Sequence, residues 1–319
     1  MMNASLQSQS CHPSVTHFAA NGINDRDAFL KKVAMLSQSA ECARADINTV
    51  TFEFAAKNMT SITRALRHYG VVCLTNVVSE QSINDFNGKF DALMSRLSDD
   101  AANPDTEHGC IDGVSWQRNL KLANNFNELV EFGAPIVNIR GSESSDTGMR
   151  DVFNVQKIKD FASDSLITEC EAQFSSGLVQ QIVRQVSPFL YTNTQVYENQ
   201  SITDTRGFHI DNIFGTHKAF LYLTDVLSEG DGPYCYAPGT HKLPYLHRLE
   251  LRYTERMGIR SRDMLSGDYL HAIKMIAPKG TLIISNQTGI HRGIPQRKGA
   301  FRRVLVGNFS EHNKVARNY

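Results

Sequence analysis

Short apolar runs alternate with turn residues through the last third of the chain, and this alternation constrains the fold more than any other feature. Turn residues separate the runs at 228–233 (SEGDGP), 238–239 (PG) and 278–280 (PKG). Many short strands separated by such turns are typical of a sandwich or a jelly roll. The expected strands span residues 188–197, 208–211, 219–226, 234–237, 281–285 and 302–309.

The first half of the chain instead predicts helices around one buried strand. Residues 24–42 and 60–69 carry apolar residues at helical spacing, and Gly70 marks the end of the second helix. Residues 71–77 are β-branched and apolar, which predicts a buried strand, and Ser79 caps a further amphipathic helix. We expect these helices to buttress one face of the main sheet. The three apolar stripes are Phe29, Val33 and Leu36; Ile62, Leu66 and Tyr69; and Ile83, Phe86, Phe90 and Leu93.

The segment from residue 98 to 145 is rich in Asn, Asp, Gly and Ser and contains the single tryptophan, Trp116. Long irregular segments in compact domains are usually functional or disordered. We therefore interpret this segment as access loops, in which Trp116 contacts the substrate; an ordinary surface insertion is the alternative. Two short helices are expected within residues 163–186. The whole chain, 1–319, is expected to form a single domain, with a mobile tail at 1–22, helices and access loops at 23–190, and a β core at 190–310.

Composition excludes several classes of partner. The chain has 33 basic and 33 acidic residues, and this zero formal net charge argues against a nucleic-acid binder or a polybasic membrane surface. Its six cysteines include no Cys-x-x-Cys pair, which argues against a zinc knuckle or a redox motif. No secretory signal and no apolar run of about 18 residues is present. We expect a cytoplasmic protein with no membrane segment, and the oligomeric state stays open.

Three residues of the strand-rich part are candidates for a metal site. In an extended strand, residues two apart share a face, so His209 and Asp211 would point into the same space. A second histidine from a distant strand would complete two imidazoles and one carboxylate, a set that leaves open positions on a non-haem Fe(II) ion. His291 is the candidate for this second histidine. Arg302 opens the next apolar run, where its guanidinium could clamp a carboxylate.

In order and context, these residues resemble the Fe(II)- and 2-oxoglutarate-dependent oxygenases, specifically the phytanoyl-CoA dioxygenase-like family. The segment 69–79 also resembles the way that family opens, so the resemblance covers most of residues 55–309. The matching motifs are His209-x-Asp211, the strand 218–225, Gly232-Pro233 with residues 237–242, Gly289-Ile-His291-Arg-Gly293, and Arg302 at the family's interval after the second histidine.

The resemblance implies a mainly β fold with helices, in which a double-stranded β-helix (a jelly roll, cupin-like) is buttressed by the N-terminal helices. It implies that His209, Asp211 and His291 hold Fe(II) at the mouth of this barrel. It also implies that 2-oxoglutarate chelates the iron and pairs its far carboxylate with Arg302, that O2 is consumed, and that succinate and CO2 are released.

Two arginines compete with Arg302 for the cosubstrate carboxylate. Arg303 is adjacent and Arg297 is close in sequence, but alternation along the strand places Arg302 on the face of Val304 and gives Arg303 the opposite face. We therefore assign the carboxylate to Arg302.

The expected reaction is hydroxylation of an unactivated C–H bond in a small-molecule metabolite. Halogenating relatives replace the carboxylate ligand with a small residue, whereas Asp211 is present here. Desaturation, cyclisation and epimerisation use the same ligands and remain alternatives. Two further alternatives are a non-catalytic cupin-like binding protein and a cupin-type metalloenzyme that needs no 2-oxo acid.

Further candidates line the strand after the motif and the next helix. Lys218, Tyr222 and Thr224 share one face of the expected strand and could line the cosubstrate pocket, or face solvent. Residues 246–260 predict a helix with a stripe of Leu246, Leu249, Tyr253 and Met257 beside Arg248, Arg252, Arg256 and Arg260. In this basic ridge Arg252 and Arg256 could hold an anionic substrate group, although a solvated helix face is the alternative. His217, His241 and His247 are expected to be structural.

Overall fold

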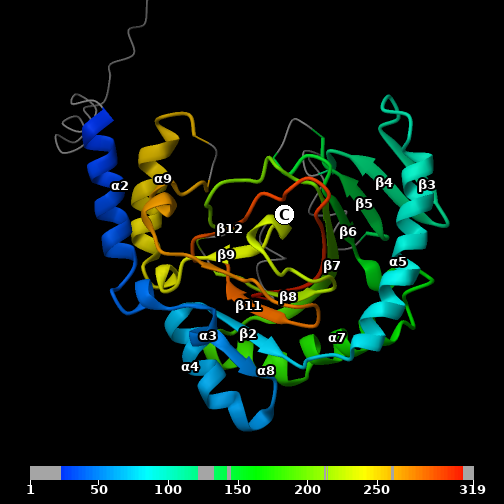
Figure 1. Ribbon diagram of the computed structural model, residues 1–319, viewed down its shortest axis with the longest axis horizontal. Coiled ribbons are helices and arrows are strands. Elements are labelled where there is room, and N and C mark those ends of the chain that lie inside the picture. The colour runs from blue at the N-terminus through cyan, green and yellow to red at the C-terminus, as the bar shows by residue number, and fades with distance from the viewer. Residues whose placement is uncertain are drawn as a thin grey trace, which may run out of the picture.

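The computed structural model describes residues 23–120, 133–141, 145–211, 213, 215–259 and 262–311. Over these residues the chain forms a mixed α/β fold with one ten-stranded sheet and one three-stranded sheet (Figure 1). The strand order is β1-β2-β11-β8-β13-β7-β6-β5-β4-β3 in the large sheet and β10-β9-β12 in the small one. The expected tail at residues 1–22 lies outside the described residues.

The strands expected from the turn pattern are present, with one exception at residues 208–211. The large sheet contains β1 (Thr51–Glu53), β2 (Val71–Thr75), β3 (His108–Ile111), β4 (Val114–Arg118), β5 (Ile136–Ile139), β6 (Arg150–Phe153), β7 (Leu190–Gln200), β8 (His217–Tyr222), β11 (Leu282–Asn286) and β13 (Phe301–Ser310). The small sheet contains β9 (Tyr234–Tyr236), β10 (Ile273–Lys274) and β12 (His291–Gly293). The α-helices are α2 (Ile23–Ser37), α3 (Ile47–Val50), α4 (Met59–Tyr69), α5 (Glu80–Asp100), α7 (Ser165–Ser175), α8 (Leu178–Val186) and α9 (Pro244–Glu255).

Alternation along the central strands separates two apolar cores. In β2, Val72 and Leu74 pack in the core that includes side chains of α4, α5, α7 and α8. Val71 and Cys73 point the other way, into a core shared with Tyr234 of the small sheet. The chain is therefore layered, with helices on one face of the large sheet and the small sheet across the other, as Figure 1 shows for α4, α8, β9 and β12.

The helix ends follow the local sequence signals. Helix α4 ends at Gly70, which adopts the left-handed conformation (φ 83°) that a residue with a side chain rarely takes. Helix α5 begins where the Ser79 hydroxyl accepts a hydrogen bond from the backbone N–H of Ser82. Among the described residues, none of the helices combines the length and the apolarity that crossing a membrane requires.

The prediction for the first helix was partly wrong. Helix α2 ends at Ser37 and not near Cys42, and residues 42–44 form a separate short 3-10 helix. Leu36 is 49% exposed, because the buried face of α2 is built from Leu30, Val33, Ala34 and Ser37 instead.

The expected access loops also require correction. Within residues 98–145, strands β3, β4 and β5 extend the large sheet, and β5 pairs with β6. The Trp116 side chain lies in the core beside α5, is 1% exposed, and donates its indole N–H to Asp100 at 2.6 Å. Trp116 is therefore a core residue, and the prediction that it contacts substrate was wrong.

Candidate metal centre

Two backbone hydrogen bonds place His209 beside His291. Each residue's N–H donates to the other's carbonyl oxygen at 3.0 Å, and the two rings are 4.5 Å apart between centroids. His291 begins β12, but residues 208–211 form no strand, because His209 makes only isolated bridges to Asp263 and His291. The expected strand was wrong, yet the expected meeting of two distant histidines is what the structure contains.

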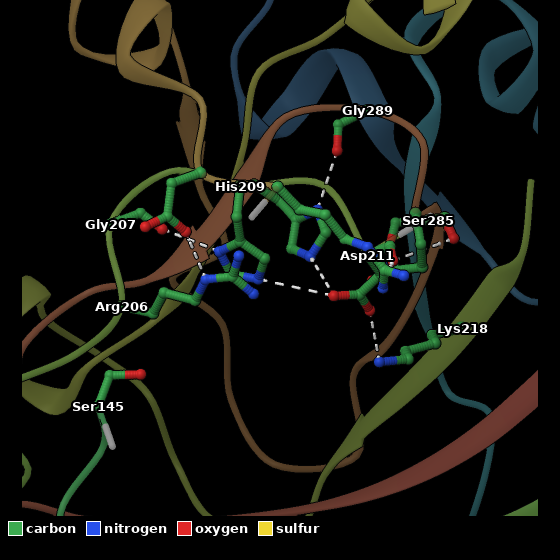
Figure 2. Close-up of polar contacts among 12 residues, drawn as sticks. Ser145, Arg206, Gly207, His209, Asp211, Lys218, Ser285 and Gly289 are labelled. Carbon is green, nitrogen blue, oxygen red and sulfur yellow. Dashed lines mark hydrogen bonds and ion pairs between the residues drawn. The ribbon is translucent and has the colours of Figure 1, made fainter. Parts of the chain in front are cut away.

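Backbone carbonyls fix the orientation of both imidazoles. The Nδ1 atom of His209 lies 2.8 Å from the oxygen of Gly207, and that of His291 lies 2.9 Å from the oxygen of Gly289. These contacts leave the two Nε2 atoms facing Oδ1 of Asp211 at 3.6 and 3.7 Å (Figure 2). Partners of this kind on the non-ligating nitrogen are typical of metal-binding histidines.

The three side chains form the one group of potential metal ligands found among the described residues. Their donor atoms all lie within 4.8 Å of one another, which is the spacing that one ion can bridge. Burial and the neighbouring His291 hold the pKa of His209 well below its usual value, despite the opposing effect of Asp211. His209 is therefore a neutral imidazole at neutral pH, the form that binds metals.

The two oxygens of Asp211 have different partners. Oδ1 faces the histidines, whereas Oδ2 accepts a hydrogen bond from the ammonium of Lys218 at 2.7 Å (Figure 2). Burial alone would raise the pKa of Asp211, but Lys218 and His291 hold it well below its usual value. Burial would likewise lower the pKa of Lys218, but Asp211 raises it. The carboxylate and the ammonium are both charged at neutral pH.

These residues lie in the wall of a cavity of about 290 Å³ between the two sheets. Strands β7, β8 and β13 contribute one wall, and Tyr234 and His291 of the small sheet contribute another. Arg140, Ser145 and Asp146 line a further part, and Figure 2 shows Arg206 beside His209.

Strand β13 sends its two adjacent arginines to opposite faces. Arg302 lines the cavity, donates to the carbonyl of Gly232 and to Asn199, and has an Nε without a partner among the described residues. Burial lowers the pKa of Arg302. Arg303 lies on the other face, where it pairs with Glu198, and the third candidate, Arg297, is an exposed residue paired with Asp231.

Of the three further cosubstrate candidates on the strand after the motif, two line the cavity and one does not. Lys218 and Tyr222 of β8 line the cavity, although the Tyr222 hydroxyl already donates to the carbonyl of Met275 at 3.0 Å. Thr224 does not line it, because β8 ends at Tyr222 and the Thr224 hydroxyl accepts a hydrogen bond from the N–H of Arg303. The expected alternation therefore fails for Thr224.

The described arginines of the basic ridge lie outside the cavity wall, and Arg260 lies outside the described residues. Arg252 and Arg256 are exposed and neither lines the cavity, so the predicted substrate contact is not supported by their positions. Helix α9 also buries a face that the sequence did not indicate. Its buried residues are Leu246, His247, Glu250 and Thr254, whereas Leu249 and Met257 of the expected stripe are 50% and 45% exposed.

Sequence reasoning missed the basic residues of the cavity wall other than Lys218 and Arg302. Arg140 pairs with Asp146 and Asp151, and Arg206 pairs with Asp263. Arg206 stands three residues before His209, and this closeness in sequence was the one signal that could have identified it. Arg140 carried no such signal, because it was expected to lie in a loop.

Comparisons with known proteins were made for both sequence and structure. No family model matches the sequence, and no curated protein is significantly similar to it. The epimerase SnoN from nogalamycin biosynthesis, described as non-haem and α-ketoglutarate-dependent, matches with a TM-score of 0.50 at 12% identity, over 81% of this chain and 84% of its own.

A second structure of SnoN, in complex with Fe3+, α-ketoglutarate and nogalamycin RO, also has a TM-score of 0.50, at 11% identity over 81% of this chain and 85% of its own. The carbocyclase SnoK, also from nogalamycin biosynthesis, has a TM-score of 0.48 at 14% identity, over 83% of this chain and 86% of its own. At these identities the similarity concerns the fold, and the chain shares the overall fold of SnoN.

Proposed function

We propose that this protein is an Fe(II)- and 2-oxoglutarate-dependent oxygenase of the phytanoyl-CoA dioxygenase-like type. One observation carries the proposal: a single cavity contains the His209, Asp211 and His291 donor group together with the incompletely paired Arg302. The cofactors named for SnoN, which shares the fold, support it. In keeping with this function, we interpret the two facing sheets as a double-stranded β-helix buttressed by the N-terminal helices.

The donor set fits a ferrous ion. Two imidazoles and one carboxylate are the ligands of non-haem iron sites that bind further groups, because three protein donors leave the remaining positions open. The Nε2 atoms and Oδ1 of Asp211 already face one another, so the ion requires no large rearrangement of these side chains. When bound, Fe(II) and 2-oxoglutarate together supply the activation of O2 for oxidation of a C–H bond, with succinate and CO2 as products.

The cavity also fits the cosubstrate. A carboxylate beside Arg302 would give Nε, which has no partner among the described residues, the acceptor that it lacks. Phe220 and Val304 line the same cavity and limit the access of water, which strengthens electrostatic contacts inside it. In this proposal Tyr222 forms part of the wall and makes no polar contact with the cosubstrate, because its hydroxyl is engaged by Met275.

Hydroxylation is the proposed outcome because Asp211 occupies the position that a halide would need. The protein ligands alone do not distinguish hydroxylation from desaturation, cyclisation or epimerisation. Product mass separates these outcomes, since hydroxylation adds one oxygen atom, desaturation and oxidative ring closure each remove two hydrogens, and epimerisation leaves the mass unchanged.

The proposed substrate is a small molecule that carries negative charge. Among the described residues, the cavity wall contains five basic side chains (Arg140, Arg206, Lys218, Arg292, Arg302) and two carboxylates (Asp146, Asp211). Asp151 and Asp263 offset part of this excess from behind the wall, through Arg140 and Arg206. The proposal of an anionic substrate therefore rests on the charges of the cavity wall and no longer on the exposed ridge of α9.

An anaerobic absorption titration tests the proposal. Metal-free protein receives Fe(II) and then 2-oxoglutarate, in parallel with His209→Ala and Arg302→Ala variants. We expect a visible charge-transfer band only when both are present, absent from the histidine variant and requiring far more 2-oxoglutarate in the arginine variant. Arg297→Ala is a matched control, since this arginine is exposed and lies outside the cavity wall.

Two results would redirect the assignment. Folded, iron-loaded protein that shows no band with 2-oxoglutarate would favour a cupin-type metalloenzyme or a binding protein. A band that Arg302→Ala leaves unchanged would remove Arg302 from the cosubstrate site while leaving the metal site intact.

A further inference from the structure

We propose that Lys218 couples the two ligands of the site, weakening the binding of a divalent cation by itself and making that binding depend on a dianionic 2-oxo acid. The proposal rests on the proposed function, since it assigns a role to Lys218 within the same cavity. It concerns how the binding of the cation and the binding of the 2-oxo acid affect each other, and not the oxidation step.

Lys218 is held where it acts on the metal through Asp211. Its side chain leaves β8 on the cavity side, and its ammonium lies 2.7 Å from Oδ2 of Asp211. The other carboxylate oxygen, Oδ1, lies 3.6 and 3.7 Å from the Nε2 atoms of His209 and His291. One carboxylate thus connects a fixed positive charge to the position between the two imidazoles (Figure 2).

This contact has opposite consequences for a cation and for an anion. The ammonium withdraws negative charge from the only carboxylate of the donor group and repels a divalent cation at close range. Both side chains are largely shielded, with 21% of Lys218 and 28% of Asp211 exposed, so solvent screens the repulsion only in part. A dianion bound at the metal adds negative charge that offsets the repulsion between the Lys218 ammonium and the cation.

The other cavity cations strengthen this asymmetry. Arg140 and Arg206 each have a carboxylate partner, whereas Arg302 makes no ion pair among the described residues. The side chains of the cavity by themselves therefore carry unbalanced positive charge. By thermodynamic reciprocity, a cosubstrate that tightens metal binding is itself bound more tightly by the metal-loaded protein.

The experiment measures this coupling directly with Mn(II). Free Mn(II) is followed by electron paramagnetic resonance during titration of metal-free protein, with and without 2-oxoglutarate, in wild type and three variants. Lys218→Gln removes the charge but can still donate a hydrogen bond to Asp211, and Lys218→Arg keeps the charge. Lys274→Met is the control, since Lys274 forms a similarly short ion pair with Glu229 at the surface, at 2.6 Å.

For wild type and Lys274→Met we expect 2-oxoglutarate to tighten Mn(II) binding by a factor of roughly 5 to 150, the usual range of coupling between sites. For Lys218→Gln we expect Mn(II) alone to bind about tenfold more tightly than to wild type, with the enhancement by 2-oxoglutarate reduced by a similar factor. Lys218→Arg should retain most of the enhancement. Thermal unfolding of each variant without ligands establishes that it is folded.

The outcomes separate this proposal from the proposed function. Wild-type protein that binds neither Mn(II) nor 2-oxoglutarate would contradict the proposed function itself. Wild-type coupling that persists in Lys218→Gln, or weaker Mn(II) binding in that variant without 2-oxoglutarate, would contradict the coupling role and make Lys218 only a support for Asp211. An arginine variant that behaves like the glutamine variant would contradict the role of charge.

Discussion

Replacing each of the two adjacent arginines of β13 with methionine should affect different properties of the protein. Arg303 donates to Glu198 at 2.5 and 3.1 Å, and the two side chains are only 2% and 1% exposed. It also contacts Asp91 and Asn87 and covers the ring of Phe90. Arg302, one residue earlier, faces the cavity and has no ion pair among the described residues.

The magnitude for Arg303→Met follows from what the substitution leaves behind. Breaking a buried ion pair typically costs about 3 to 5 kcal/mol, because one charge stays buried without its partner. Here Arg150 still contacts Glu198 at 2.6 Å, which places the expected loss at the lower end, about 3 kcal/mol. The lost contact with the exposed Asp91 adds less than about 1 kcal/mol. With a urea dependence of about 3 kcal/mol per molar, the unfolding midpoint should fall by about 1 M.

Arg302→Met should leave the free energy of unfolding within about 1 kcal/mol of wild type, since the substitution removes a buried cation that lacks an ion pair. It should instead weaken binding of 2-oxoglutarate to the metal-loaded protein. Fluorescence of the single tryptophan, Trp116, reports urea unfolding because this side chain is buried in the core. Equal destabilisation by both substitutions would refute the assignment of Arg302 to the cosubstrate and of Arg303 to the fold.

Two further predictions concern the buried residues His247 and Gly289. Burial lowers the pKa of the fully buried His247 to about 4, against about 6.5 in an unfolded chain, so only the unfolded chain takes up this proton as the pH falls below about 6.5. This histidine should therefore lower the free energy of unfolding by about 1.4 kcal/mol for each unit that the pH falls between about 6.5 and 4. His247→Gln should reduce the slope of that free energy against pH by nearly this amount, the equivalent of one proton. An unchanged slope would exclude His247 as a source. Gly289→Ala would place Cβ 1.9 Å from the Tyr236 hydroxyl, so we expect the free energy of urea unfolding to fall by about 1 to 3 kcal/mol. We also expect weaker Mn(II) binding, because the Gly289 carbonyl orients His291. Gly88→Ala on the exposed face of α5 is the control, because apart from its own helix backbone no described atom lies within 4 Å of the new Cβ. It should be neutral or stabilising, and equal effects of the two substitutions would refute the steric argument.

The sequence predicted the donor group, although the strand expected to carry two of its members is absent. His209 and Asp211 were expected to share a face of a strand, whereas the structure has only bridges at His209. The side chains still converge, because the paired backbone of His209 and His291 sets their direction. Alternation along β13 correctly predicted the faces of Arg302 and Arg303, because successive side chains of a regular strand point to opposite faces of the sheet.

Other features depended on contacts that periodicity does not contain. Helix α9 buries Glu250, whose carboxylate accepts hydrogen bonds from the backbone and hydroxyl of Ser266. Because this partner comes from a separate segment, helical periodicity does not show that Glu250 is buried. The position of Trp116 was similarly misread, since β3 to β5 are short strands within a polar segment and their pairing with the large sheet is non-local.

An anaerobic crystal structure with Fe(II) and 2-oxoglutarate would show directly whether this site holds both. We expect one iron ion bound by Nε2 of His209, Oδ1 of Asp211 and Nε2 of His291. We also expect 2-oxoglutarate to chelate this ion with its far carboxylate on Arg302, while Lys218 keeps its contact with Oδ2 of Asp211. Iron bound elsewhere, or a fourth protein ligand that closes the site, would contradict the proposed function.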